Sequence, residues 1–184
     1  NNKAGTFTLG ANQTIASITS TGGVNGTVNL GGGDTVTGNI GNIGTLNLAA
    51  GGATALQGTT TATSVNLAGG AQVTTTGLLS SSNPVAFSGS VTQLTLNGGA
   101  SGSFSLGTDI NNILTLGAGQ TITGSVTSTG GGGTLNFAGA GEVTGGIGSV
   151  TNKLGQVKFS GAGAIELDGS LFANTLVIAN AGVE

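Results

Sequence analysis

One short pattern recurs along the whole chain: two apolar residues separated by a single residue and followed by small or polar residues. The nine copies are Phe7-Thr8-Leu9, Val28-Asn29-Leu30, Leu46-Asn47-Leu48, Val65-Asn66-Leu67, Leu94-Thr95-Leu96, Leu114-Thr115-Leu116, Leu135-Asn136-Phe137, Val157-Lys158-Phe159 and Leu176-Val177-Ile178. Successive copies begin 21, 18, 19, 29, 20, 21, 22 and 19 residues apart. A period of about 21 residues is typical of solenoids, in which each repeat packs on its neighbours.

Most periods contain a second short apolar segment, and several contain a third apolar position. The second segments are Thr35-Val36-Thr37-Gly38, Gln72-Val73-Thr74, Thr121-Ile122-Thr123-Gly124, Glu142-Val143-Thr144-Gly145 and Ala164-Ile165-Glu166, and the third positions are Ile40, Val126, Ile147 and Leu171. Val, Ile and Thr favour strands, whereas the 39 glycines favour turns over helices. The sequence therefore predicts an all-β fold, a right-handed parallel β-helix of about nine coils, with residues 1–184 as a single segment.

Leucine-rich repeats and antiparallel sandwiches also contain regularly spaced apolar segments, but both fit less well. The longer leucine-rich signature is missing, and a sandwich would not repeat the same ordered pair of segments in each period.

Alternation along each strand assigns side chains to the inside or the outside of the coil. We expect one inward core column, made of Val28, Leu30, Leu46, Leu48, Val65, Leu67, Leu94, Leu96, Leu114, Leu116, Leu135, Phe137, Val157 and Phe159. The residues between them form one outward polar ladder, Thr8, Asn29, Asn47, Asn66, Thr95, Thr115 and Asn136, which continues into Lys158 and Val177. Stacked Asn and Thr side chains can bond along the axis. The ladder is thus first a structural feature and second a contact surface.

The 29-residue interval between Leu67 and Leu94 is the main irregularity of the repeat. It contains Pro84, which cannot donate a hydrogen bond to a strand ladder. We expect residues 77–87 to form an excursion from a coil, tolerated at a surface corner. The alternative is that Val85-Ala86-Phe87 forms an extra strand.

The stretch Gly31-Gly32-Gly33-Asp34 resembles a nucleotide-binding loop at first sight. A phosphate-binding loop needs a Lys and a hydroxyl residue after its glycines, and the chain contains no Gly-Lys pair. The glycines are therefore interpreted as a corner of the coil, and no cofactor is expected.

Asp34 also suggests the calcium-binding β-roll, in which an Asp recurs in every coil. The residues that the repeat aligns with it are Gln72, Gln120 and Glu142, so the carboxylate does not recur. We expect no metal site that organises the fold, and a role for Asp34 itself stays open.

Catalysis is not expected, since the chain has no His, Cys, Arg or Tyr from which the usual nucleophile and base pairs are built. Glu166 and Asp168 are two residues apart, with Lys158 about one coil away, and they are interpreted as a surface cluster of ion pairs. The alternative is a carbohydrate-active β-helix enzyme that uses these carboxylates.

Threonine pairs such as Thr35/Thr37 and Thr121/Thr123, and the run Thr59/Thr61/Thr63, resemble the flat arrays of ice-binding solenoids. Aligning the coils gives an outward column of Thr37, Thr74, Thr123 and Thr144, but its partner column contains Gln72 and Glu142. Ice binding is therefore kept only as a minor alternative.

Charge and hydropathy bear on the partners. The net charge of −3 and the three lysines argue against nucleic acid, and no apolar run is long enough to insert this segment into a bilayer. Repeat arrays need capped ends, and neither terminus offers an obvious cap, so end-to-end self-association into a fibre is a further alternative.

Several segments resemble the passenger domains of Gram-negative autotransporters, and among them the rickettsial outer-membrane surface antigens. The resemblance lies in Thr-Val-Asn-Leu (27–30), Val-Thr-Gly-Asn-Ile-Gly-Asn-Ile-Gly (36–44), Ile-Thr-Gly-Ser-Val (122–126) and Val-Thr-Gly-Gly-Ile-Gly (143–148), and in the Gly/Thr/Asn-rich composition of residues 1–184. These motifs are degenerate and indicate the class of protein more firmly than any member.

The resemblance implies a secreted β-helix stalk on the bacterial surface, attached to the outer membrane through a C-terminal barrel and used in adhesion and virulence. A host-cell surface protein or glycan would be the partner. The chain begins with Asn1-Asn2-Lys3 and shows no signal peptide, barrel or autochaperone cap, so we expect an internal piece of a longer passenger. No adhesion motif of the family can be matched to residues here.

Overall fold

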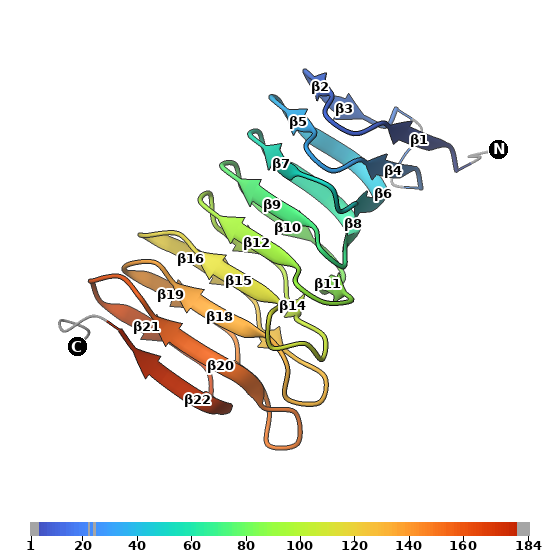
Figure 1. The fold of residues 1–184 in the computed structure, drawn as a ribbon. Coiled ribbons are helices and arrows are strands. Elements are labelled where there is room, and N and C mark those ends of the chain that lie inside the picture. The colour runs from blue at the N-terminus through green and yellow to red at the C-terminus, as the bar shows by residue number, and fades with distance from the viewer. Residues whose placement is uncertain (1–3, 22, 24, 180–184) are drawn as a thin grey trace.

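The computed structural model describes residues 4–21, 23 and 25–179, and its strands wind into a parallel β-solenoid of about nine coils (Figure 1). Asn1, Asn2, Lys3 and Glu184 lie outside the described residues. Each strand pairs in parallel with a strand roughly one repeat away in sequence. The predicted parallel β-helix is therefore confirmed. The described part of the chain contains no helix of the length and apolarity needed to cross a membrane.

Each coil has three faces. Face 1 contains β1 (Thr6–Leu9), β4 (Thr27–Leu30), the second halves of β6 (Ile40–Leu48) and β8 (Thr60–Ala68), β11 (Val85–Ser88), β14 (Phe104–Ser105) and β17 (Val126–Thr127), and then the bridges at Ile147 and Leu171. Face 2 contains β2 (Thr14–Ile15), β5 (Thr35–Val36), β7 (Ala53–Leu56), β9 (Gln72–Thr75), β12 (Gln93–Leu96), β15 (Ile113–Leu116), β18 (Thr134–Phe137), β20 (Leu154–Phe159) and β22 (Ala173–Ile178). Face 3 contains β3 (Ile18–Thr19), the first halves of β6 and β8, β10 (Leu79–Ser81), β13 (Ala100–Ser101), β16 (Gln120–Thr123), β19 (Gly141–Val143) and β21 (Ile165–Leu167).

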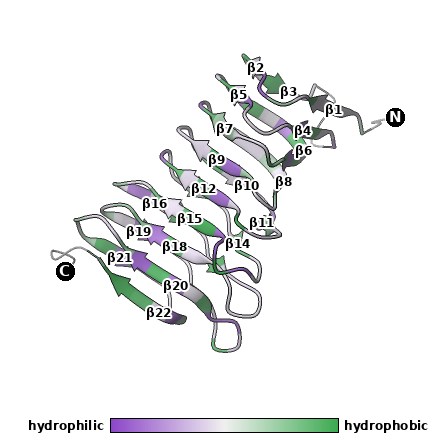
Figure 2. Cartoon of the chain, viewed as in Figure 1, coloured by the Kyte–Doolittle hydropathy of each residue, from purple (hydrophilic) through white to green (hydrophobic). Residues whose placement is uncertain are grey.

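The core consists of aliphatic side chains that stack on their equivalents in the next coil. All fourteen residues that the repeat places inside are buried. The strands alternate between apolar and polar residues along most of their length (Figure 2), as strands with one buried side do. Near the C-terminal end, the rings of Phe137 and Phe159 stack with their centroids 5.3 Å apart. Continuous stacking of this kind lets a narrow core exclude water with few aromatic residues.

The fourteen residues form two sets of columns, and the prediction of a single column is wrong. Of these fourteen residues, the six from Val28 to Leu67 point inward from face 1, and the eight from Leu94 to Phe159 point inward from face 2. The strand register shows where the pattern changes from face 1 to face 2: Asn66 pairs with Ala86 on face 1, whereas Thr95 pairs with Thr74 on face 2. The same three-residue pattern therefore occurs on two faces of the coil.

The change of face also explains the long interval, and the predicted excursion at residues 77–87 is wrong. β10 pairs with β8 and β13, and β11 pairs with β8 and β14, so both strands belong to the regular ladders. The alternative of a further strand at Val85-Ala86-Phe87 is confirmed. Pro84 directly precedes β11 and therefore lies at a corner, where its lack of an N–H breaks no ladder.

Two tight corners of four residues shape the coils, and each is used in one half of the rod. In the first half, the step from face 2 to face 3 takes four residues: Val36 to Ile40, Leu56 to Thr60, Thr75 to Leu79 and Leu96 to Ala100. In the second half, the step from face 3 to face 1 takes four: Ala100 to Phe104, Ile122 to Val126, Val143 to Ile147 and Leu167 to Leu171. The tight corner thus moves at β13.

Glycine occupies every one of these tight corners. The first column is Gly38, Gly58, Gly77 and Gly98, and the second is Gly102, Gly124, Gly145 and Gly169. A Cβ on Gly58 would come within 3.0 Å of the Gly38 carbonyl group, and a Cβ on Gly77 would meet Gly58 in the same way. The stacked backbones therefore leave no room for any side chain.

We expect Gly58→Ala to lower the free energy of unfolding by roughly 1–3 kcal/mol, since the added methyl group overpacks a rigid backbone contact. Gly41→Ala is the matched control, because Gly41 has open space where its Cβ would lie. The control should change stability by less than about 0.5 kcal/mol. Chemical denaturation followed by circular dichroism measures both, and equal effects of the two variants would contradict the packing explanation.

Candidate functional site

The glycine-rich stretch that resembles a nucleotide loop is a corner held between two neighbouring coils. A Cβ on Gly31 would meet the backbone at Ala11, and a Cβ on Gly32 would meet the backbone at Ala50. Asn12 N–H donates to the Gly32 carbonyl at 3.2 Å, so this peptide group is used in coil stacking. The loop therefore has no open cradle for a phosphate, and its interpretation as a corner is confirmed.

Asp34 lies in the core on face 2, directly before β5. Its side chain is 0% exposed. The ladder that pairs Thr35 with Ala55 places Asp34 beside Thr54, and the next coils have Val73 and Leu94 at this position. The predicted equivalents Gln72, Gln120 and Glu142 are wrong. Gln72 lies one register position away on face 2, and Gln120 and Glu142 lie on face 3.

The Asp34 carboxyl group is only half satisfied. Its Oδ1 accepts a hydrogen bond from the Gln13 N–H at 2.8 Å, whereas Oδ2 is buried without a partner among the described residues. The same part of the chain contains no group of three or more His, Cys, Asp or Glu residues able to hold a metal ion. Asp34 is thus an isolated polar group at a position that is apolar two coils later.

On face 1, the outward Asn side chains bond to one another in a continuous ladder. Asn29 Nδ2 donates to Thr8 Oγ1 at 3.1 Å, Asn47 Nδ2 donates to Asn29 Oδ1 at 2.8 Å, and Asn66 Nδ2 donates to Asn47 Oδ1 at 2.9 Å. Each bond joins residues that are direct partners in the strand register. The ladder ends at Ala86, which pairs with Asn66 but has no donor to offer its Oδ1.

The predicted polar ladder is therefore two separate rows, and its description as one row is wrong. Thr95, Thr115 and Asn136 stack on face 2, where Thr74 precedes them and Lys158 and Val177 follow. Asn136 Oδ1 accepts from Ser160 Oγ at 2.8 Å. Among the described residues, no side-chain hydrogen bond joins members of this second row to each other.

A shallow groove of about 400 Å³ runs over this second row. The loop before β15 borders it with Ile110 and Asn111, and the strands contribute side chains that include Thr115, Asn136, Gln156 and Lys158. Ile110 is 48% exposed. The groove thus combines one cation, several amides and an apolar rim, which are groups that bind and orient a polar ligand.

The carboxylates lie elsewhere, and the predicted ion-pair cluster of Glu166, Asp168 and Lys158 is not formed. Lys158 is in register with Asn136 on face 2, whereas Glu166 is in register with Glu142 on face 3. Thr121 Oγ1 donates to Glu142 Oε2 at 3.1 Å. Glu142 and Glu166 are like charges directly opposite one another. Their repulsion lowers the stability of the fold unless a hydrogen-bond donor or a cation compensates it.

The predicted threonine column of Thr37, Thr74, Thr123 and Thr144 is also wrong. Thr74 belongs to β9 on face 2 and Thr123 to β16 on face 3, so these residues do not stack. The array proposed for ice binding therefore does not exist in that form.

Asn112 is a structural polar residue that the sequence did not reveal. It is 0% exposed, its Oδ1 accepts from Thr92 N–H at 2.9 Å, and its Nδ2 donates to the carbonyls of Gly89 and Leu106 at 2.8 and 2.9 Å. These bonds hold the start of β15 to the loops that contain Gly89, Thr92 and Leu106. A polar residue directly before a strand in an apolar pattern is the signal that could have indicated it.

In comparisons with known proteins, no family model, no curated protein sequence and no solved structure matches the chain significantly. What the chain does must be inferred from its faces.

We expect Asp34→Val to raise the free energy of unfolding by about 1–3 kcal/mol, because it removes a buried acceptor without a partner and fills the site as Val73 does. Thr35→Val adds the same side chain on the outward side and should have little effect. Thermal denaturation compares them. A lower melting temperature for Asp34→Val would show that the bond to Gln13 outweighs the buried oxygen.

Ala86→Asn should extend the face 1 ladder by one bond, from the new Nδ2 to Asn66 Oδ1, and should stabilise the fold by up to about 1 kcal/mol. Ala86→Asp is the control, because a carboxylate of the same shape brings no donor and faces an acceptor. Denaturant midpoints should rank the Asn variant above the Asp variant. The same midpoint for both would mean that the ladder contributes no net stability.

Proposed function

We propose that this chain is a non-enzymatic structural and adhesive module of a secreted bacterial surface protein. Nine coils at about 4.8 Å per coil give a rod of roughly 40 Å. Such a rod holds contact surfaces away from the membrane in which its protein is anchored. The autotransporter passenger type, on the outer-membrane surface, is the class that the sequence motifs favour.

The observation that carries the proposal is the difference between the two polar rows. On face 1 the amides satisfy one another along the axis, so this row stabilises the rod. On face 2 the groups around Asn136 and Lys158 line an open groove, and their remaining donors face outward. Donors that are not used within a protein can exchange their hydrogen bonds to water for hydrogen bonds to a ligand.

The groove fits a polar partner with sparse negative charge. Among the described residues, Lys158 is the one cation that lines the groove. The whole chain carries a net charge of −3, which repels a dense polyanion. Amides such as Asn136 and Gln156 pair well with hydroxyl or peptide groups. A host-cell surface protein or glycan therefore suits the groove as a partner, and the reaction chemistry of an enzyme is not required.

Adhesion of protein-coated beads to epithelial cells tests the proposal. The expected result is binding above that of uncoated beads, with a several-fold loss on Lys158→Gln combined with Asn136→Ala. Lys153→Gln is the matched control, since it removes the same charge from a loop outside the groove. The variants must keep their circular dichroism spectra.

No adhesion by the folded rod, or an equal loss with the control, would argue against the groove as the contact surface. Cleavage of a polysaccharide that is abolished by Glu166→Ala would instead support the carbohydrate-active enzyme.

A further inference from the structure

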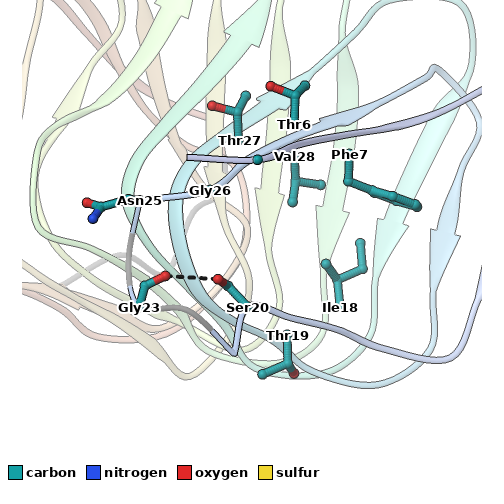
Figure 3. Close-up of a pocket in the computed structure, with 11 residues that line it drawn as sticks. Thr6, Phe7, Ile18, Thr19, Ser20, Gly23, Asn25, Gly26, Thr27 and Val28 are labelled. Carbon is teal, nitrogen blue, oxygen red and sulfur yellow. Dashed lines mark hydrogen bonds between the residues drawn. The ribbon is translucent and has the colours of Figure 1, made fainter. Parts of the chain in front are cut away.

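The hollows of the described structure differ in what they offer a ligand. Near the N-terminal end, Phe7, Ile18 and Val28 point into a space of about 240 Å³, and Ser20 Oγ donates to the Gly23 carbonyl beside it at 2.9 Å (Figure 3). None of the described residues that line this space carries a charge. The groove on face 2 is lined by Lys158 and several amides, so it offers more groups with which to select a ligand.

The amides in the groove on face 2 offer mainly hydrogen-bond donors. Asn136 Oδ1 already accepts from Ser160 Oγ at 2.8 Å, so its Nδ2 group remains for a ligand. Asn136 and Lys158 are direct partners in the strand register, and Gln156 lies two residues before Lys158 on the same outward side. An ammonium group and two amides therefore lie side by side, and donors of this kind suit a carboxylate.

The charge of the groove is a single positive one. Lys158 lies on a different face from Glu142 and Glu166, so these carboxylates do not neutralise it. Asp109 is in the bordering loop, but its Oδ1 accepts from the N–H and the Nδ2 of Asn111 at 2.8 and 2.9 Å. Among the described residues that line the groove, Lys158 alone is charged. The site therefore suits a ligand that brings one negative charge.

The apolar wall of the groove is held in place before any ligand arrives. Thr134 Oγ1 donates to the Ile110 carbonyl at 3.1 Å, and the buried Asn112 fixes the end of the same loop by three hydrogen bonds. A Cβ on Gly155 would collide with Ile110 Cδ1, so the isoleucine side chain lies on the backbone of β20. A wall that is already ordered lowers the entropy lost on binding.

The floor of the groove restricts how a ligand can bind. Its strands β15, β18 and β20 each pair with a neighbour on both sides, so no strand edge is open there for a peptide to join as a further strand. Recognition therefore depends on side chains, which are amides and hydroxyls next to Ile110 and Ile113. A sugar ring matches this mixture, because it carries hydroxyl groups at its rim and C–H groups on its faces.

We propose that the groove on face 2 binds a carboxylated sugar. The carboxylate accepts from Lys158 Nζ and Asn136 Nδ2, the ring hydroxyls bond to Gln156 and Thr115, and a C–H face of the ring lies against Ile110. The inference rests on the proposed function, in which this groove is the contact surface, and it names the class of ligand. An acidic peptide and a sulfated polyanion are the other occupants that the test distinguishes.

A titration of the isotope-labelled chain, followed by NMR spectroscopy, tests the class of ligand. The acidic probes are a hyaluronan octasaccharide and sialyllactose, and their neutral counterparts are the carboxyl-reduced octasaccharide and lactose. At least one acidic probe should shift the side-chain amide signals of Asn136 and Gln156 and bind about five-fold more tightly than its neutral counterpart. The tighter acidic probe shows whether the carboxylate lies within the sugar chain or at its end.

Substitution of Lys158 tests the position of the carboxylate. Lys158→Gln should abolish the preference, so that the acidic and neutral sugars bind equally weakly, whereas Lys158→Arg should keep it because the charge remains. Lys153→Gln is the matched control and should bind like the natural chain, since Lys153 does not line the groove. Circular dichroism spectra must show that each variant is folded.

The proposal would be overturned if no sugar bound, if the acidic and neutral probes bound equally, or if the preference survived in Lys158→Gln. Tighter binding of heparin or of a glutamate-containing peptide would also overturn it, in favour of that ligand. Bead adhesion without sugar binding would leave the adhesive role with another ligand. Sugar binding without bead adhesion would remove the adhesive role and retain the site.

Discussion

The fold depends on the direct stacking of each backbone on its equivalent one coil away. Parallel ladders fix this spacing at about 4.8 Å, so every side chain sits on the side chain in the same position of the next coil. Aliphatic residues become columns, amides become ladders, and corners pack backbone against backbone. Since the spacing is fixed by hydrogen bonds, a residue that does not suit its column cannot move away from it.

This constraint separates the roles of the polar rows. Asn29, Asn47 and Asn66 stack at a spacing that lets each amide serve its neighbour, and their hydrogen-bonding capacity along the axis is used. On face 2 the row changes from Thr to Asn to Lys, so consecutive side chains do not match, and their groups stay available in the groove. Regularity thus favours stability, and irregularity leaves polar groups unpaired along the axis.

The sequence predicts the class of fold well, because Val28, Leu30 and their counterparts report strands that are buried on one side. It does not report which of three faces a strand belongs to, since the same pattern suits face 1 at Leu67 and face 2 at Leu94. The shift at 77–87 is therefore invisible without the strand register. Asp34 and Asn112 could not be placed for a related reason, because their burial depends on where the inward alternation begins.

The position of the glycine corner makes the two halves of the rod different parts. Coils up to Gly98 turn sharply between faces 2 and 3, and coils from Gly102 turn sharply between faces 3 and 1. A coil duplicated within its own half would keep its glycine under the neighbouring glycine. The same coil transplanted into the other half would place side chains where backbones touch, so gene duplication can lengthen this rod only from within each half.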